Sequence, residues 1–312
     1  MTQALRSLTD LTSLDRETLV ELLDSAERFL APEAATAHRK LLAGEAVALL
    51  FFEPSTRTRF SFELAARRVG ADVIALHEST SSQTKGETLS DTLSTLAAMG
   101  ARHFVVRHRE NGIMATLAAN LPPGTTLINA GEGTRAHPTQ GLLDAFTIRR
   151  HRPEIERLTV TIVGDIAHSR VARSTLSALK GLGVGALHLV GPAEFLSAPG
   201  ELPGVATTDL AAGLDGADVV MALRIQHERL GEGQTTDPET YRKRYGLTIE
   251  RLERYAKPDV LLMHPGPTNW GVELAPELAH WPRSLIREQV RNGVAVRMAM
   301  FARLSAELHN HV

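Results

Sequence analysis

The strongest chemical signal in the sequence is a run in which hydroxyl and guanidinium side chains are interleaved, Ser55-Thr56-Arg57-Thr58-Arg59. The run follows an apolar stretch, residues 46–50, that is typical of a buried strand, and it precedes small and apolar residues at the spacing of one helix face. At such a strand-to-helix turn the first backbone N–H groups of the helix lack internal partners and the helix dipole is positive. Because hydroxyls and arginines are added there, the turn is predicted to bind an anion, with phosphate as the favoured occupant.

A purely structural interpretation of this run remains open on the residues alone. Ser55 or Thr56 could cap the helix, and the two arginines could lie in solvent. The interleaving of hydroxyls with two arginines directly after a buried strand favours phosphate binding. The turn is not a nucleotide P-loop, because the glycines and the Gly-Lys pair of that motif are missing.

Two further side chains could act on an anion or a carbonyl group. Arg107 ends an apolar stretch, and an arginine at the end of a parallel strand points into the crevice where such sheets bind ligands. A surface arginine explains that spacing equally well. His137 directly precedes Pro138, which suits the first position of a helix, so its imidazole is expected to be neutral and able to donate a hydrogen bond to a polarised carbonyl. A capping histidine is the alternative.

The second half of the chain offers side chains that suit a ligand with carboxylates. Arg170 opens a predicted helix after a buried strand, and the Gly-x-Gly-x-x-Gly motif of dinucleotide sites is absent there. Arg224 and Gln226 are two residues apart after another predicted strand, so in an extended segment their side chains face the same way. An arginine fork with a neighbouring amide suits a small dicarboxylate.

Three loops complete the set of candidate functional segments. In His264-Pro265-Gly266-Pro267 the two prolines predict an irregular turn whose carbonyl groups could bind a ligand. Residues 231–245 are polar, and either a lid or a variable surface loop would explain them. Residues 77–86 form a third polar loop, whose only lysine is Lys85.

Length and composition limit the class of protein. A chain of 312 residues exceeds the usual size of one hydrophobic core, so two domains are expected. A net charge of −2 with mixed signs argues against nucleic-acid and anionic-membrane surfaces. The absence of cysteine excludes disulfides, thiolate metal ligands and cysteine nucleophiles. Neither a signal-peptide pattern nor an apolar run of membrane-spanning length occurs, so a cytoplasmic enzyme is expected.

The elements that must position these residues alternate between strand and helix, which favours an α/β class with mainly parallel sheets. The last helix begins at about residue 286, and the helix over residues 138–151 is expected to join the two domains. The predicted strands cover residues 46–50, 71–76, 103–106, 125–129, 158–163, 186–190, 219–223 and 259–263.

With these elements in place, Ser55–Arg59 resembles the carbamoyl-phosphate signature of the transcarbamoylase family. The resemblance covers nearly the whole chain and is to the catalytic chains of the aspartate carbamoyltransferases. It implies two α/β domains, each a mainly parallel sheet flanked by helices, with the active site in the interdomain cleft. Residues 1–150 would bind carbamoyl phosphate and residues 151–312 aspartate, with the C-terminal helix, about residues 286–308, packing back on the first domain.

The resemblance also implies the reaction and the residues that perform it. The carbamoyl group of carbamoyl phosphate would pass to the amino group of L-aspartate, giving N-carbamoyl-L-aspartate and phosphate for pyrimidine biosynthesis. The implied catalytic residues are Arg57, Thr58, Lys85, Arg107 and His137. The implied carbamoyl-phosphate contacts are Ser55, Thr56, Arg57, Thr58, Ser81, Lys85, Arg107, His137, Gln140 and Pro267. The implied aspartate contacts are Lys85, Arg170, Arg224, Gln226 and Gly266, and Glu53 and Arg229 would act in domain closure.

The partners implied by the resemblance are a second and a third copy of the chain. In such a homotrimer Ser81 and Lys85 would serve the active site of an adjacent subunit. Regulatory or dihydroorotase subunits are further partners that the sequence leaves open. Neither a metal ion nor an organic cofactor is expected, because phosphate is already a good leaving group.

Two other functions remain as alternatives. Ornithine carbamoyltransferases share the phosphate signature, but they carry a cysteine after the late histidine, where this chain has Pro265 after His264. A cationic amine would also be repelled by Arg170 and Arg224. A non-catalytic assembly subunit is the second alternative, and the argument against it is the presence together of Ser55–Arg59, Lys85, His137 and Arg224. One departure from the family is Trp270, where many members have an arginine, and it bears on closure or on an accessory partner.

Overall fold

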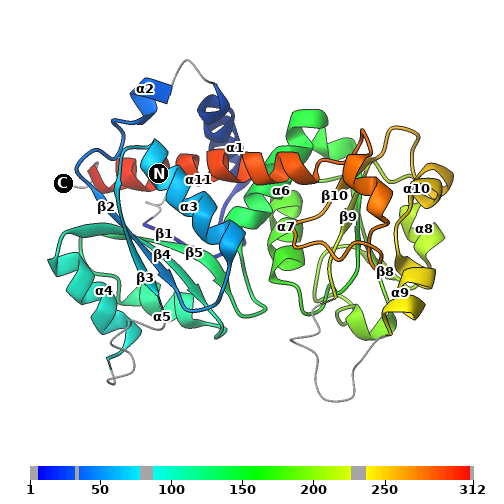
Figure 1. The fold of residues 1–312 in the computed structure, drawn as a ribbon, viewed down its shortest axis with the longest axis horizontal. Coiled ribbons are helices and arrows are strands. Elements are labelled where there is room, and N and C mark those ends of the chain that lie inside the picture. Colours follow the sequence, from blue (N-terminus) through cyan, green and yellow to red (C-terminus); the bar gives the residue numbers. More distant parts are fainter. Residues whose placement is uncertain (1–5, 32–34, 78–86, 226–236, 310–312) are drawn as a thin grey trace. The chain divides into compact units, whose positions relative to one another are not determined.

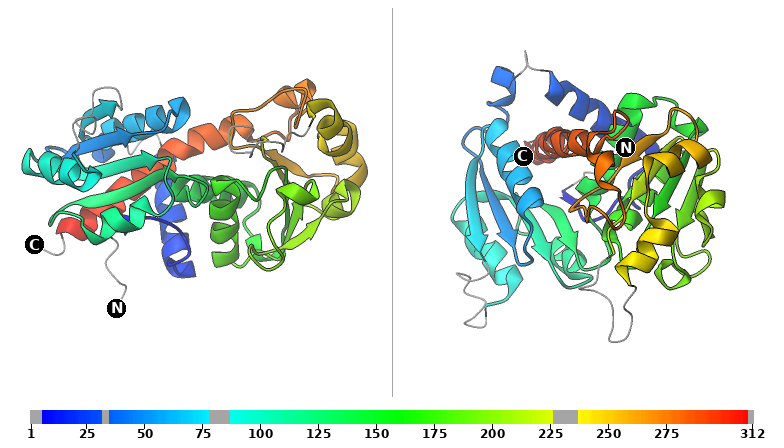
Figure 2. Two further views of the ribbon diagram at one scale, coloured as in Figure 1. Left: turned by 90° about the horizontal axis from the view of Figure 1, so that it is seen from below. Right: turned by 45° about the vertical axis from the view of Figure 1, so that its right-hand side comes forward.

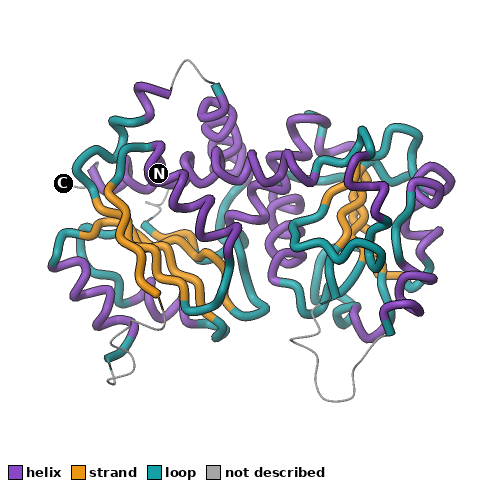
Figure 3. The backbone as a smooth tube through the Cα atoms, in the orientation of Figure 1, coloured by secondary structure: helices purple, strands orange, loops and turns teal. Residues whose placement is uncertain are grey.

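The computed structural model describes residues 6–31, 35–77, 87–225 and 237–309. The chain forms two compact units, one of Met1–Leu143 with Arg291–Val312 and the other of Asp144–Val290. Each unit contains one five-stranded sheet, seen as a group of neighbouring orange traces in Figure 3. The two divisions between the units fall inside the helices α6 (Pro138–His151) and α11 (Ile286–His309). The first unit is therefore built from both ends of the chain.

In the first unit all strand pairings are parallel, and the strands lie in the order β1-β5-β4-β2-β3. The central strands β2 and β4 are buried over most of their length, as expected for continuous apolar runs in a sheet that is covered on both faces. The strands are β1 (Ser7–Leu8), β2 (Ala46–Phe51), β3 (Asp72–His77), β4 (Ala101–His108) and β5 (Thr126–Glu132).

Helices cover both faces of this sheet (Figures 1 and 2). On one face Leu50 packs in a single apolar cluster with Leu93 of α4 and Met114 of α5. On the other face the ring of Phe62 from α3 lies 6.1 Å from the ring of Phe301 of α11, edge to face. The helices that begin and end within this unit are α1 (Arg16–Leu30), α2 (Ala35–His38), α3 (Thr56–Arg68), α4 (Leu89–Ala98) and α5 (Ile113–Ala119).

The second unit repeats this plan with a parallel sheet in the order β10-β9-β6-β7-β8. Its core includes Val220 and Leu262 from the sheet together with the aromatic residues Tyr241, Tyr245 and Trp281. The strands are β6 (Thr159–Val163), β7 (Ala186–Val190), β8 (Val205–Thr207), β9 (Val219–Ala222) and β10 (Leu261–Met263). The helices are α7 (Arg170–Gly181), α8 (Leu210–Leu214), α9 (Pro238–Tyr245) and α10 (Ile249–Tyr255), with short 3₁₀ segments at Ile155–Arg157, Ala193–Phe195 and Pro276–His280.

The predicted fold class, two α/β units each with a parallel sheet flanked by helices, is confirmed. Each predicted strand is found, with ends that differ by no more than three residues. The loop interpretation of residues 231–245 is wrong from residue 238 onward, because α9 occupies Pro238–Tyr245. Asp237 caps this helix by accepting a hydrogen bond from the Thr240 N–H at 2.8 Å, and its proline occupies the first turn. No helix in the described part of the chain has the length and hydropathy of a membrane span.

Candidate active site

The predicted phosphate-binding residues lie at one edge of the first sheet. Strands β2, β4 and β5 are neighbours and run in the same direction, so the residues that follow them meet at the carboxyl edge of the sheet. The turn after β2 carries Glu53 and Ser55, β4 carries Arg107 near its end, and the turn after β5 leads to His137. Ligands of open parallel sheets bind at this edge. The topology thus brings together side chains from segments about 80 residues apart in sequence.

The signature run forms the strand-to-helix turn that the sequence predicts. Ser55 is the N-cap residue of α3, and its carbonyl oxygen accepts a hydrogen bond from the Arg59 N–H at 3.2 Å. Its hydroxyl makes no side-chain capping hydrogen bond, so the capping alternative does not account for this serine. Thr56 and Arg57 are exposed in the first turn of the helix, whereas Thr58 is buried. Hydroxyl, guanidinium and helix N–H groups therefore share one helix terminus, as an anion site requires.

Arg107 is a buried arginine held in place by an ion pair. Its Nη2 lies 2.6 Å from Oε1 of Glu53, and its Nη1 donates to the carbonyl oxygen of Ala130 at 3.2 Å. Only 7% of the residue is exposed, so the surface-arginine alternative is wrong. The guanidinium of this β4 residue is therefore held between Glu53, in the turn after β2, and Ala130 of β5.

His137 occupies the position before α6, as predicted. The helix begins at Pro138, and the N–H groups of Gln140 and Gly141 donate to the His137 carbonyl oxygen at 2.9 and 3.2 Å. The backbone of His137 thus caps the helix, so the capping role does not fall to its imidazole. Both His137 and Gln140 are buried, with 3% and 9% of their surfaces exposed.

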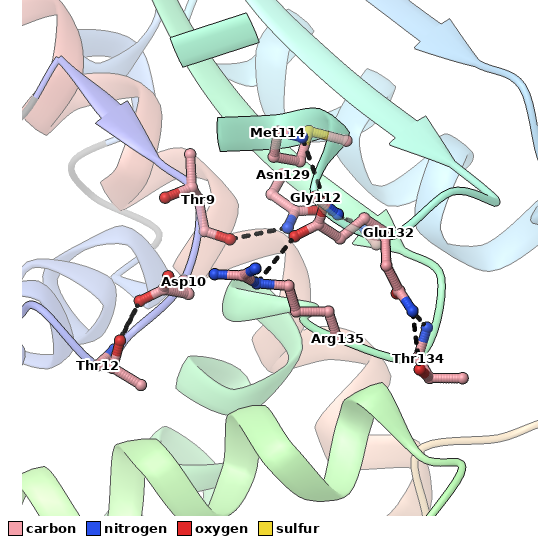
Figure 4. A network of polar contacts seen from close by, with 11 residues as sticks. Thr9, Asp10, Thr12, Gly112, Met114, Asn129, Glu132, Thr134 and Arg135 are labelled. Carbon is pink, nitrogen blue, oxygen red and sulfur yellow. Dashed lines mark hydrogen bonds and ion pairs between the residues drawn. The ribbon is translucent and has the colours of Figure 1, made fainter. Parts of the chain in front are cut away.

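A buried polar network, which sequence reasoning missed, supports the turn that leads to His137 (Figure 4). Glu132, at the end of β5, is 2% exposed and accepts hydrogen bonds from the N–H groups of Gly112 and Met114 at 3.1 and 3.2 Å. Burial raises the pKa of the Glu132 carboxyl group, although these N–H groups and Arg135 oppose the shift. Asn129 accepts from the Gly131 N–H at 2.7 Å and donates to the Thr9 carbonyl at 2.8 Å.

The predicted aspartate-binding residues of the second unit also follow neighbouring strands. Strands β10, β9 and β6 are adjacent, and the residues that follow them include Gly266, Arg224 and Arg170 respectively. Arg170 is the first residue of α7 and only 6% of it is exposed, while the hydroxyl of Ser169 caps the helix by accepting from the Ala172 N–H at 3.1 Å. The carboxyl edge of the second sheet therefore presents two arginines.

The turn after β10 adds an irregular backbone to the same edge. The peptide bond between Gly266 and Pro267 is cis, and Gly266 has a φ of +70°, a conformation that favours glycine. Pro267 is exposed. Trp270, the departure from the family, lies beyond this turn with 42% of its surface exposed.

Four residues named from the sequence fall outside the described residues. They are Ser81, Lys85, Gln226 and Arg229. Their contributions to the site remain predictions.

Family models match most of the chain in two segments. Residues 6–150 match the model described as "Aspartate/ornithine carbamoyltransferase, carbamoyl-P binding domain". Residues 156–304 match the model described as "Aspartate/ornithine carbamoyltransferase, Asp/Orn binding domain".

Curated relatives carry the name of one of the two enzyme types. The aspartate carbamoyltransferase catalytic subunit of Stenotrophomonas maltophilia (strain R551-3) is 52% identical over 306 residues, which is 96% of either chain. The protein of the same name from Xanthomonas axonopodis pv. citri (strain 306) is 52% identical over 303 residues, again with 96% of each chain covered.

Solved structures agree in fold and in name. Aspartate transcarbamoylase from Trypanosoma cruzi in complex with carbamoyl aspartate and phosphate is 28% identical, with a TM-score of 0.86 over 96% of this chain and 95% of that chain. The catalytic subunit of M. jannaschii aspartate transcarbamoylase is 31% identical, with a TM-score of 0.83 over 96% of this chain and 98% of that chain. The resemblance noted in the sequence is confirmed, and the chain belongs to the aspartate/ornithine carbamoyltransferase family.

Proposed function

We propose that the chain is an enzyme that transfers the carbamoyl group of carbamoyl phosphate to the amino group of L-aspartate, a step of pyrimidine biosynthesis. One observation carries the proposal: a turn of interleaved hydroxyls and arginines begins α3, at the same sheet edge as the buried Arg107 and His137. The curated relatives at 52% identity are named aspartate carbamoyltransferase catalytic subunit, which favours this enzyme type over the ornithine-specific one.

Carbamoyl phosphate is assigned to the first unit. The phosphate group accepts hydrogen bonds from the α3 terminus and from Ser55, Thr56, Arg57 and Thr58, where the helix dipole adds to the positive charge. The carbonyl oxygen of the carbamoyl group faces Thr58, Arg107 and His137. Gln140 and the turn at Pro267 orient the carbamoyl amine.

The chemistry requires stabilisation of developing negative charge more than it requires a base. The deprotonated amine of aspartate attacks the carbamoyl carbon, the C–O bond to phosphate breaks from a tetrahedral intermediate, and the leaving phosphate takes up the proton that the attacking nitrogen loses. Negative charge develops on the carbonyl oxygen in that intermediate, so donors whose positions are already determined lower the barrier most. Arg107 suits this role because the Glu53 carboxylate and the Ala130 carbonyl hold its guanidinium in place.

Aspartate is assigned to the second unit. Arg170, Arg224, Gln226 and Gly266 hold its two carboxylates, with Lys85 as a further cation. Two arginines at one sheet edge favour a dicarboxylate and disfavour the cationic side chain of ornithine. The T. cruzi enzyme has been solved with carbamoyl phosphate and aspartate, at 27% identity and a TM-score of 0.82 over 96% of both chains.

The active form is assigned as a homotrimer with shared active sites. Ser81 and Lys85 of one subunit complete the site of the next. In support, Phe60 and Leu64 are four residues apart on α3 and expose 57% and 42% of their surfaces, and neighbouring exposed apolar side chains suit a contact with another subunit. The trimer acts in the cytoplasm, and regulatory or dihydroorotase subunits are further candidate partners.

A direct assay of the purified chain tests the reaction. Incubation with carbamoyl phosphate and aspartate should produce carbamoyl aspartate, detected colorimetrically, whereas the same incubation with ornithine should produce no citrulline. A bisubstrate mimic that joins a phosphonate to aspartate should inhibit competitively with carbamoyl phosphate. No product with either amine, or product with ornithine alone, would refute the proposed function.

Mixing two inactive variants tests the shared site separately. Arg57→Ala and Lys85→Ala chains, combined under conditions that exchange subunits, should regain activity, because one interface of each hybrid carries both native residues. If native mass spectrometry detects the hybrids and they are nevertheless inactive, the shared site is refuted. The proposed reaction is not affected by that result.

A further inference from the structure

A buried histidine and a buried glutamate lie behind the Gly266–Pro267 turn. His264 directly follows β10 and is 2% exposed, and Glu273 is 1% exposed. Nε2 of His264 lies 3.2 Å from Oε1 of Glu273. Gly266 is partly buried and Pro267 is exposed, so the turn faces outward while the polar pair lies beneath it. Buried polar groups are costly unless they are hydrogen-bonded, so the partners of this pair are informative.

The hydrogen bonds determine which ring nitrogen carries the proton. The Gly266 N–H donates to Nδ1 of His264 at 2.7 Å, so Nδ1 must present a lone pair. The proton of the neutral ring is then on Nε2, from which it is donated to Glu273. One imidazole thus accepts from the turn on one side and is oriented by a carboxylate on the other.

The far end of the turn is held by the same carboxylate. Oε1 of Glu273 also accepts a hydrogen bond from the Asn269 N–H, four residues before it. The backbone of Glu273 is itself anchored, because its carbonyl oxygen accepts from the Leu247 N–H at 2.9 Å. The turn from Gly266 to Asn269 is therefore attached at both ends to one His–Glu pair.

The start of the turn is attached to a third buried side chain. The His264 N–H donates to Oε1 of Gln289 at 2.9 Å, and Nε2 of Gln289 donates to Asp144 at 2.8 Å. Asp144 in turn accepts from the hydroxyl of Thr175 at 2.8 Å. These contacts connect the turn to α6, α7 and α11 within the second unit. Buried side chains thus accept the hydrogen bonds that the N–H groups of His264, Gly266 and Asn269 donate.

We propose that His264 and Glu273 are positioning residues, which hold the Gly266–Pro267 turn in the shape that receives the substrates. The inference rests on the proposed function, which assigns Gly266 and Pro267 to substrate contacts. Pro265 and Pro267 have no N–H, so the Gly266 N–H is the only backbone donor between those of His264 and Thr268, and it can orient this part of the turn. Water could satisfy that donor equally well in energy, but it would not determine its direction. The imidazole does so because its other nitrogen is bound to an anchored carboxylate.

Two matched pairs of variants test the proposal. His264→Leu removes both hydrogen bonds, whereas His264→Asn keeps an acceptor close to the position of Nδ1. Glu273→Leu removes the anchor, whereas Glu273→Gln keeps an oxygen that can accept from both donors. A misplacement near 1 Å costs about 10²-fold in rate. We therefore expect each leucine variant to lose about 10²-fold in kcat/KM for aspartate, and its matched polar variant to regain most of the loss. Phosphate binding to the first unit should be unchanged in all four.

His188→Leu is the control substitution. This histidine of β7 is partly buried, its Nδ1 lies 3.2 Å from the Gly213 carbonyl oxygen, and it is remote in sequence from every assigned contact. It should retain the wild-type kinetic constants. If the His264 variants and their Glu273 counterparts fold and show wild-type constants, or if the polar variants are as impaired as the leucine variants, the proposal is overturned.

A measurement on the unsubstituted protein protects the test against variants that fail to fold. ¹⁵N-histidine NMR should show His264 as the neutral tautomer protonated at Nε2, with the resonance assigned by its loss in His264→Asn. A proton on Nδ1 would overturn the proposal whatever the kinetics. The assay of the wild-type chain distinguishes failure of the proposed function from failure of the positioning role. Absence of carbamoyl aspartate in that assay would refute the proposed function without affecting the tautomer result.

Discussion

Nη2 of Arg107 lies 2.6 Å from Oε1 of Glu53, which joins the end of β4 to the turn after β2. Phe51 and Arg107 are also paired in register, and the Phe52 N–H donates to the Arg107 carbonyl oxygen at 2.9 Å. Backbone and side-chain hydrogen bonds therefore both fix the position of Arg107. The guanidinium is thereby oriented before any substrate arrives. A donor that needs no reorganisation during the reaction is the kind that lowers a barrier with developing charge.

Glu53→Ala should therefore impair both stability and turnover. It leaves a buried guanidinium without its carboxylate, at a cost of about 2 kcal/mol, less than for a fully buried pair because the Glu53 side chain is 23% exposed. Turnover should fall by about 10²-fold as Arg107 loses its orientation. Glu53→Gln, which keeps an acceptor, should lose less of both. Urea unfolding and steady-state kinetics provide the two measurements, and a fully active, equally stable Glu53→Ala chain would contradict the role given to this pair.

Loss of a substrate donor should act on turnover alone. Arg57→Ala and His137→Ala should each reduce kcat by about 10²–10³-fold, since each removes a group assigned to developing or transferred charge. Arg67→Ala is a suitable control, because Arg67 lies on the same helix, pairs with Glu63 at 3.1 Å and is 61% exposed at its side chain. Circular dichroism should show all three variants folded. Near-normal turnover in either site variant would count against the assignment.

Glu132 should show that its hydrogen bonds matter more than its charge. Glu132→Ala loses the acceptor for one buried and one partly buried N–H group and should cost about 2–3 kcal/mol in the free energy of unfolding. Glu132→Gln keeps an acceptor and should be close to neutral at pH 7. Burial raises the pKa of the Glu132 carboxyl group above its usual value of 4.5. The resulting stabilisation is fully present below pH 4.5 and is lost as pH rises through the folded-state pKa, because the buried group must then ionise. The free energy of unfolding of Glu132→Gln should therefore rise relative to that of the wild type as pH increases across that window. Thermal unfolding between pH 4 and 8 tests this sign.

Glu45 should show the opposite sign. Burial alone would raise the pKa of this carboxyl group, but the hydrogen bond and charge of His103, with Ser305 and His309, lower it overall. A lowered folded-state pKa stabilises the fold above the usual value near 4.5, and this contribution is lost as pH falls through the folded-state pKa. Glu45→Gln should be destabilised at pH 7 by about 1–2 kcal/mol, with a difference that narrows on acidification. A difference that stays constant between pH 7 and pH 3 would contradict this account.

Tyr241 offers a test in which removal of a polar atom should not harm the fold. Its ring is fully buried in the second core, and among the described residues its hydroxyl has no hydrogen-bond partner. Burial raises the pKa of that hydroxyl, which stays neutral. Tyr241→Phe should therefore be neutral or stabilising by about 1 kcal/mol. A clear loss of stability by urea unfolding would indicate a partner for the hydroxyl.

The parts of the fold that were predictable from sequence are those with a strong local pattern. Apolar runs such as Ala46–Leu50 predict buried parallel strands. The arginine-rich turn that follows predicts an anion site from the known chemistry of a helix N-terminus. Strands β1 and β8 were missed because two or three residues carry no periodicity. The helix α9 was missed because its composition is polar, although Asp237 and Pro238 form a recognisable helix start.

The supporting residues of the site were the least predictable. Glu132 and Glu273 lie in polar, glycine-containing segments, where an acidic residue suggests a solvent-exposed position. Their burial depends on N–H partners that only the folded chain supplies, 20 and 18 residues away for Glu132. The one available signal was local: Glu273 is flanked by Val272 and Leu274, and Leu274 is fully buried. Arg107 shows the same limit, since its spacing alone did not distinguish a surface position from a buried one.

The division of the first unit between the two ends of the chain has a consequence for biosynthesis. Phe301 fills the core against Phe62, and Ser305 donates to Glu45 at 3.1 Å, so residues made after Asp144–Val290 complete a unit that begins before it. Once the ribosome has added Val290, the second unit, Asp144–Val290, is complete in sequence. The first unit still lacks the residues after Val290, which form part of its interior. Completion of the first unit must therefore wait until the residues after Val290 are made, and a product that terminates near residue 290 would lack part of the interior of that unit.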